Sequence, residues 1–324
     1  MDGHPGHGVR RDRLMRHFLR DDDLSPAEQA AVLDLAVRLK AAPYDARPLA
    51  GPRTVAVLFD RPTLRTQASF ASGIAELGGF PMIIDGSLAQ IGVRESVTDT
   101  ARVLGRQASL VVWRTDDQAR LETMAEHSGV PVINALTDQF HPCQALADLL
   151  TVREHRGDLA GQTLAFVGDA ACNMGHSYLL AGATAGMHVR VSGPDGFGPD
   201  AEVLERAQEI AALTRGSAEF VADPVEAVTG AGVLATDTWV SMGREGEAEA
   251  RTREFAPWQL NDALLEHAAD DAIVLHCLPA YRGREITAEV IEGPRSVVWD
   301  EAENRRHAQK AVMAWLLEAA GGPS

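Results

Sequence analysis

The sequence has few aromatic residues and fewer basic than acidic residues. Aromatic residues make up 5% of the 324 residues, so the cores must be built mainly from Ala, Val, Leu and Ile. The formal net charge is −16, from 30 basic and 46 acidic side chains. This charge argues against a nucleic-acid-binding protein, because such proteins present a basic surface. A local basic pocket for a small anion remains compatible with it.

Cysteines are also few, and long apolar runs are missing. Cys143, Cys172 and Cys277 are an odd number without the spacing of a disulfide framework or a CxxC motif, so we expect a reducing compartment and no metal site. No run approaches the roughly 20 apolar residues of a membrane span. Residues 1–23 lack the apolar segment of a signal peptide and are too acidic for a mitochondrial transit peptide. The sequence therefore predicts a cytoplasmic protein that binds neither membranes nor nucleic acid.

Short apolar runs alternate with helical patterns along most of the chain. A Ser-Pro-Ala-Glu capping box at 25–28 opens a helix to about Lys40, and a long helix is expected at 141–156. Near-continuously apolar runs are typical of parallel strands covered on both faces. We expect strands at 54–59, 81–84, 110–113, 131–134, 163–167, 188–191, 219–221, 233–236, 273–276 and 297–299.

The length and this alternation predict an α/β fold with two doubly wound parallel-sheet domains joined by long helices. We place the domains at residues 1–150 and 151–324, with a hinge at 157–161 and a final helix at 301–317. A ligand cleft is expected between the two domains. The sequence shows no internal repeat.

Two Cys-His motifs follow apolar strands. His276-Cys277-Leu278-Pro279 comes directly after the run 272–275, and His141-Pro142-Cys143-Gln144 follows the strand at 131–134 after a short turn. The carboxyl ends of strands in open α/β sheets bind ligands. Either motif alone is better explained as a packed cysteine beside a structural histidine. The two together favour a functional site.

The loop after the first expected strand has the features of an anion site. We predict Thr63 as a helix N-cap, so that the backbone N–H groups of Leu64, Arg65 and Thr66 point out of the helix start. A plain capped helix with a solvated arginine explains this loop about equally well. Arg114 ends another strand, and with Arg65 and His141 it would suit a phosphate next to a polarised carbonyl.

The second half contains three further candidate loops. Gly168–Gly175 lacks the GxGxxG spacing, which argues against a nicotinamide enzyme. Asp237 follows a strand and could meet an amine, although an isolated Asp in such a place more often caps a helix. Arg305 brings one more cation to a strand–helix junction, where a solvated surface arginine is the alternative.

Together these loops resemble the aspartate/ornithine carbamoyltransferase family, from about Val55 to Leu317. The Ser-Met-Gly and His-Cys-Leu-Pro loops are similar to those of its ornithine-specific branch. The motifs that carry the resemblance are Phe-Asp-Arg-Pro-Thr-Leu-Arg-Thr at 59–66, Asp-Thr-Ala-Arg at 99–102, His-Pro-Cys-Gln at 141–144, Asp-Thr-Trp-Val-Ser-Met-Gly at 237–243, His-Cys-Leu-Pro-Ala at 276–280 and Val-Trp-Asp-Glu-Ala-Glu-Asn-Arg at 298–305.

The resemblance implies transfer of a carbamoyl group from carbamoyl phosphate to the side-chain amine of L-ornithine, giving L-citrulline and phosphate. Such a step belongs to arginine biosynthesis or to a urea-cycle-type sequence, and it uses no cofactor. The first domain would bind carbamoyl phosphate and the second ornithine, with a helix at 301–320 packing back on the first. The family also implies a homotrimer or a multiple of trimers.

Residue roles follow from the same resemblance. Arg114, His141 and Cys277 would be catalytic. Carbamoyl phosphate would contact Thr63, Leu64, Arg65, Thr66, Gln90 (from a neighbouring subunit), Arg114, His141, Gln144, Cys277, Leu278 and Arg305. Ornithine would contact Asn173, Asp237, Ser241 and Met242.

Some positions depart from the family pattern, namely Gln67, Ala71, Cys172 and Tyr281. Gln67 and Ala71 replace an Arg–Glu pair four residues apart on one helix face, and losing both members leaves no orphan charge. These changes keep two alternatives open. One is a carbamoyltransferase for a different amine, and the other is a non-catalytic regulatory paralogue.

Overall fold

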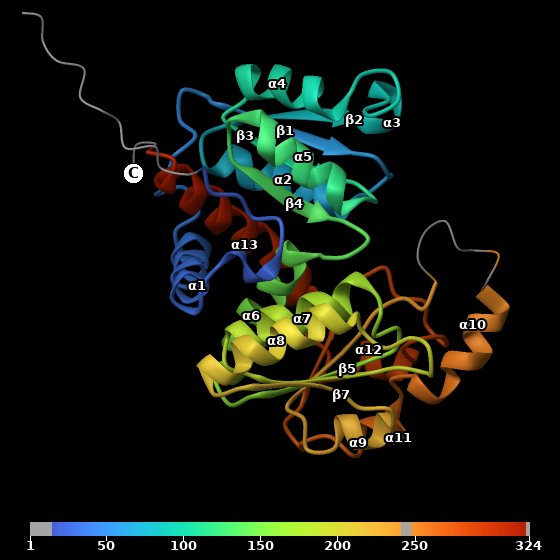
Figure 1. Cartoon of the computed structure of the whole chain (residues 1–324). Helices are drawn as coiled ribbons and strands as arrows, with labels where there is room; N and C mark the ends of the chain where they lie inside the picture. Colours follow the sequence, from blue (N-terminus) through green and yellow to red (C-terminus); the bar gives the residue numbers. More distant parts are fainter. Residues whose placement is uncertain (1–14, 241–245, 247, 322–324) are drawn as a thin grey trace, which may run out of the picture.

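The computed structural model describes residues 15–240, 246 and 248–321, and its two parallel sheets form the two lobes of Figure 1. The strand order is β2-β1-β3-β4 in the first sheet and β7-β6-β5-β8-β9 in the second. This confirms the predicted α/β class with two parallel-sheet domains. The strands are β1 (Thr54–Phe59), β2 (Phe80–Asp85), β3 (Leu110–Arg114), β4 (Val132–Leu136), β5 (Thr163–Val167), β6 (His188–Ser192), β7 (Ser217–Phe220), β8 (Val233–Thr236) and β9 (Ile273–His276).

Helices connect the strands as crossovers and cover both faces of each sheet. The longer ones are α1 (Pro26–Ala41), α2 (Arg65–Glu76), α4 (Val97–Gln107), α5 (Gln118–Ser128), α6 (Pro142–Arg156), α7 (Asn173–Thr184), α8 (Ala201–Thr214), α10 (Ala248–Phe255) and α13 (Val298–Ala319). The shorter ones are η1 (Asp21–Asp23), α3 (Gly86–Ala89), α9 (Pro224–Val228), α11 (Asp262–Leu265), η3 (Ala256–Trp258) and α12 (Ala288–Ile291).

Alternate residues of each strand enter different cores, as the two-residue period of a strand requires. In β1, Val55 and Val57 pack with residues of α1, α2, α6 and α13, whereas Ala56 and Leu58 pack with residues of α4 and α5. In the second lobe α7 and α8 cover one face of the sheet, and α9 and α11 lie on the opposite face (Figure 1). Burial on both faces explains why these strands read as continuous apolar runs.

Two long helices join the lobes. α6 leaves the first sheet and leads to β5, and α13 packs against α1, α2 and α6. One continuous apolar core therefore runs from the inner face of the first sheet through α6, α7 and α13 to the inner face of the second. The helices whose ends carry site residues are thus held by the same core as both sheets.

Two predictions about element starts are wrong. Residues 297–299 are not a strand, because α13 begins at Val298 and only an isolated bridge joins Val274 to Ser296. The first turn of α13 carries Asp300 and Glu301, whose charges favour a helix start over a strand end. Thr63 does not cap α2, since Leu64 is the N-cap residue and no side chain caps that helix.

The capping box at α1 is confirmed, because the Ser25 side chain accepts from the backbone N–H of Glu28 and the Glu28 carboxylate accepts from that of Ser25. Within the described part of the chain, no helix combines the length and the apolar character that crossing a membrane requires.

Candidate active site

The candidate site residues follow strands at which the order of each sheet reverses direction. From β1 the chain passes to β2 on one side and then to β3 on the other, and from β5 it passes to β6 on one side and later to β8 on the other. Such switch points leave a crevice at the carboxyl ends of the strands, where ligands bind in open α/β sheets. Arg114 is the last residue of β3, and Asp237 follows β8 directly.

Three arginines form a cationic cluster in the first lobe, in which Arg305 is buried and Arg65 and Arg114 are partly buried. Arg65 begins α2, Arg114 ends β3, and Arg305 lies on α13 with 3% of its surface exposed. Burial, followed by the charges of Arg305 and Arg65, lowers the pKa of Arg114 to about 10. Burial also lowers the pKa of Arg305, and the charge of Arg65 contributes. Like charges held together in low dielectric favour binding of a multiply charged anion.

Threonine hydroxyls hold two of these guanidinium groups. Arg305 donates from Nη2 to Oγ1 of Thr66 at 3.1 Å, and Arg114 donates from Nη1 to Oγ1 of Thr63 at 3.5 Å. Thr63 in turn donates to Oγ1 of Thr66 at 3.1 Å. With no side-chain cap on α2, the first N–H groups of that helix, which begin beside the exposed Leu64, stay available to an anion.

His141 is a neutral imidazole beside this cluster. It is the N-cap residue of α6 and is 4% exposed, and its Nδ1 has no hydrogen-bond partner among the described residues. Burial, then the charges of Arg305, Arg114 and Arg65, hold the pKa of His141 well below its ordinary value. A neutral ring can donate one N–H to a carbonyl oxygen without adding a further positive charge.

Gln144 lies directly behind the cluster and is fully buried. Its Oε1 accepts from Arg305, and its Nε2 donates to Oδ1 of Asp148 at 2.7 Å and to Oε1 of Glu301 at 3.0 Å. The sequence analysis missed Asp148 and Glu301. The one available signal was the i, i+4 spacing of Gln144 and Asp148 within an otherwise apolar helix.

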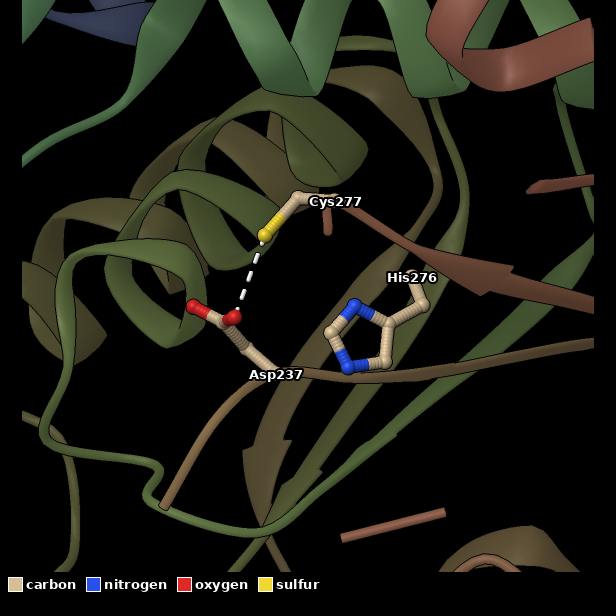
Figure 2. Close-up of side chains that lie close together, drawn as sticks. All are labelled: Asp237, His276 and Cys277. Atoms are coloured by element: carbon tan, nitrogen blue, oxygen red, sulfur yellow. Dashed lines mark hydrogen bonds between the residues drawn. The ribbon is translucent and has the colours of Figure 1, made fainter. Parts of the chain in front are cut away.

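The second lobe contributes a thiol and a carboxyl group. Cys277 donates from Sγ to Oδ1 of Asp237 at 3.1 Å (Figure 2). Burial raises the pKa of Asp237, and burial together with the charge of Asp237 raises the pKa of Cys277 well above its ordinary value. The thiol is therefore protonated at neutral pH, and it acts as a donor rather than as a nucleophilic thiolate.

His276 fixes the loop that carries Cys277. Its Nδ1 accepts from the backbone N–H of Leu278 at 2.9 Å, and its Nε2 lies 3.2 Å from Oε1 of the buried Glu285. Leu278 has a φ of 56°, a left-handed conformation that costs a non-glycine residue roughly 1 kcal/mol or more. The histidine thus holds a strained backbone at the strand end.

Asp237, His276 and Cys277 also place one potential metal ligand each within 4.8 Å of one another (Figure 2). Nδ1 of His276, however, accepts from Leu278, and its Nε2 faces Glu285. A metal ion at this point would have to displace one of those contacts. The arrangement fits a hydrogen-bonded network better than a metal centre.

The remaining candidates form no hydrogen bond with this group or lie outside the described residues. Asn173 begins α7 after β5 and donates from Nδ2 to the carbonyl of Thr137 at 2.7 Å. Gln90 is exposed after α3, with a φ of 51°. Ser241 and Met242 lie outside the described residues.

Comparison with protein families assigns both lobes. The model of the aspartate/ornithine carbamoyltransferase carbamoyl-P binding domain matches residues 16–154. The model of the Asp/Orn binding domain of the same family matches residues 160–316.

Similar proteins and structures agree with this assignment. The chain is 64% identical over 304 residues to an ornithine carbamoyltransferase of Clavibacter michiganensis subsp. michiganensis, covering 94% of this chain and 99% of that protein. A crystal structure of ornithine carbamoyltransferase from Gloeobacter violaceus is 48% identical, with a TM-score of 0.84 over 93% of this chain and 98% of that one. The enzyme from Pyrococcus furiosus is 42% identical, with a TM-score of 0.89 over 93% and 96%. An N-acetyl-L-ornithine transcarbamylase is also similar, at 30% identity and a TM-score of 0.83 over 93% and 99%.

Proposed function

Because the chain belongs to the aspartate/ornithine carbamoyltransferase family, we propose that it transfers the carbamoyl group of carbamoyl phosphate to the side-chain amine of L-ornithine, giving L-citrulline and phosphate. One observation on the structure of this chain supports the proposal. The cluster of Arg65, Arg114 and Arg305 lies beside a neutral His141, and Cys277 lies close enough to Arg114 and Arg305 to influence the pKa of both. An anion site of the first lobe therefore borders a thiol–carboxyl pair of the second.

In this proposal the phosphate binds to the start of α2 and to the arginine cluster. The backbone N–H groups from Leu64 onward and the two threonine hydroxyls supply hydrogen bonds, and Arg65 and Arg114 supply charge. Arg305 reaches the same ligand. The phosphate neutralises the electrostatic repulsion among the three arginine side chains.

The carbamoyl group would lie between Arg114, His141 and Gln144. When the amine of ornithine attacks the carbonyl carbon, a C–N bond forms and negative charge builds on the carbonyl oxygen. Arg114 and the N–H of His141 stabilise that charge, because they are fixed donors in a buried site. The C–O bond to phosphate then breaks, and the departing phosphate can take the proton that the amine loses.

The amine of ornithine would meet Asp237 and Cys277. Ornithine arrives as an ammonium ion and must lose a proton before it attacks, and the carboxyl of Asp237 can accept a hydrogen bond from it and orient it. We propose Asn173, Ser241 and Met242 as contacts for the α-amino acid end, with Leu278 beside the carbamoyl group.

We further propose a homotrimer, or a multiple of trimers, in which Gln90 completes the site of a neighbouring subunit. Its exposed position supports this role. The proposed domains are residues 1–150 for carbamoyl phosphate and 151–324 for ornithine, with residues 301–320 packed on the first. A cytoplasmic protein acting in arginine biosynthesis fits the proposed reaction.

The direct test is citrulline formation by the purified protein from carbamoyl phosphate and L-ornithine, with putrescine, lysine, aspartate and N-acetyl-L-ornithine assayed in parallel. We expect turnover with ornithine on the order of 10 s⁻¹. If only another amine is carbamoylated, that amine and not ornithine is the acceptor. Binding of carbamoyl phosphate without transfer to any amine would favour a regulatory paralogue.

A further inference from the structure

Two buried carboxyl groups lie immediately behind the site and enter none of the steps above. Asp148 is on α6 and Glu301 on α13, with 1% and 0% of their surfaces exposed. Although they lie 153 positions apart in sequence, both accept a hydrogen bond from Nε2 of Gln144. Charged groups in such a position require partners, because desolvation alone would make them costly.

The other oxygens of both carboxyl groups also have donors. Oδ2 of Asp148 accepts from the hydroxyl of Tyr178 at 2.7 Å, and Oε2 of Glu301 accepts from the backbone N–H of His276 at 2.8 Å. Glu301 thus connects the amide of Gln144 with the strand end that carries Cys277. One side chain contacts residues on the phosphate-facing and on the amine-facing side of the site.

The two acids share a proton at neutral pH. Burial raises the pKa of Glu301 well above its ordinary value, and the charge of Asp148 adds to this. Burial also raises the pKa of Asp148, to about 6, while hydrogen bonds from Tyr178, Gln144 and Glu301 oppose the change. Glu301 is therefore the protonated member and Asp148 the charged one, and the pair presents acceptors to Gln144.

This arrangement decides which way the amide of Gln144 points. An amide has one donor end and one acceptor end. The carboxylate of Asp148 accepts only, and a protonated Glu301 that donates its proton to Asp148 still has lone pairs that accept. With Asp148 and Glu301 on one side, Nε2 must face them, and Oε1 is turned toward Arg305 and the proposed carbamoyl site. An oxygen in that place can accept a hydrogen bond from the –NH₂ of a carbamoyl group, but gains nothing from a methyl group.

We propose that Asp148 and Glu301 are a positioning pair that fixes the amide of Gln144 with its oxygen toward the ligand, and that this orientation selects carbamoyl phosphate over acyl phosphates that lack the amine. The proposal rests on the proposed function for the identity of the ligand. Neither acid touches the substrate, and both act through Gln144.

The test compares carbamoyl phosphate, acetyl phosphate and inorganic phosphate as ligands of the full-length protein, with dissociation constants measured by calorimetry. Acetyl phosphate differs from carbamoyl phosphate by a methyl group in place of the amine. We expect the wild-type protein to prefer carbamoyl phosphate by about tenfold, the value of one net hydrogen bond. Glu301→Leu should bring this preference close to one while leaving the affinity for inorganic phosphate unchanged.

Three further variants separate positioning from a structural role. Glu301→Gln keeps the shape and the acceptor for the backbone N–H of His276, but its –NH₂ then faces Nε2 of Gln144, so an acceptor of that amide is lost and the preference should fall. Asp148→Asn keeps the shape but has one acceptor oxygen for two donors, so it should reduce the preference if Glu301→Leu does not fold. Glu303→Leu, at an exposed position on the same helix, is the matched control and should bind all three ligands like the wild type.

A folded Glu301→Leu protein with the wild-type preference would overturn the proposal, and so would an equal loss of affinity for all three phosphates. A wild-type protein without the preference would overturn it too. If the preference is present but no amine is carbamoylated, the positioning pair stands and the proposed acceptor chemistry fails. The two proposals can therefore fail separately.

Discussion

The proposed phosphate-facing half of the site and the proposed amine-facing half occupy equivalent places in the two sheets but carry groups of opposite charge. In the first lobe the strand ends at the switch point supply Arg114 and the loop to Arg65. In the second lobe the strand ends supply Asp237 and Cys277. In the proposed function, the topology therefore sets where each ligand would bind, and the residue types at the strand ends set which ligand would bind there.

Burial acts on the two halves in opposite directions. It lowers the pKa of Arg114 in the first half and raises the pKa of Asp237 in the second, so each half is driven toward its neutral form. Arg114 still carries its charge at neutral pH, and in each half a substrate of opposite charge would stabilise the ionised form. The proposed dianionic phosphate and cationic amine are the charges that the two halves lack.

Removing a charge from the phosphate half should have the largest effect. We expect Arg65→Ala to lower kcat/KM about 1,000-fold, because a fixed cationic donor to the phosphate and the developing charge is lost. The fold should be retained, since Arg65 is only partly buried at the start of α2. Steady-state kinetics with circular dichroism tests this, and Arg106→Ala, at an exposed position in the same lobe, is the control. Wild-type kinetics for Arg65→Ala would remove it from the phosphate site.

Removing the thiol from the amine half should have a smaller and more selective effect. Cys277→Ala deletes the donor to Asp237, and we expect the KM for ornithine to rise roughly tenfold, as for one hydrogen bond to a charged group. Affinity for carbamoyl phosphate should change less. Cys172→Ala is a matched control. The charge of Asp237 also raises the pKa of this second thiol, but Cys172 donates no hydrogen bond to Asp237 among the described contacts. Unchanged ornithine kinetics in Cys277→Ala would exclude the thiol from the mechanism.

Much of the fold was predictable because parallel strands buried on both faces give continuous apolar runs. The run at 54–59, for example, corresponds residue for residue to β1. The prediction for 297–299 was wrong because three apolar residues fit a strand end and the first turn of a buried helix equally well, and only the tertiary contacts of α13 decide between them.

Site residues were predictable only where a charged residue directly follows or ends a predicted strand. Arg114 and Asp237 could be proposed from the pattern, although their roles stay predictions. Asp148 and Glu301 could not, because their contact with Gln144 depends on how α6 and α13 pack, and residue spacing does not show this for helices far apart in sequence.

The smallest predicted effect concerns the pH dependence of stability. It tests whether His141, the neutral group beside the arginines of the phosphate half, stays uncharged in the folded protein. The pKa of His141 in the folded protein lies well below the unfolded value of about 6.5. Below that pH the unfolded chain takes up a proton that the folded protein does not. This group therefore makes the free energy of unfolding decrease as the pH is lowered. The loss is at most about 1.4 kcal/mol per pH unit.

His141→Gln removes this dependence, so its free energy of unfolding should decrease less than that of the wild type between pH 7.5 and 5.5. Urea unfolding of both proteins at the two pH values gives the double difference, in which the contributions of other buried groups with shifted pKa values, such as His176 and Asp148, cancel. Equal pH dependence in the two proteins would show that His141 takes up its proton in the folded state. Its ring would then add a fourth positive charge to the arginine cluster, and the neutral hydrogen-bond donor of the proposed mechanism would have to be replaced by an imidazolium.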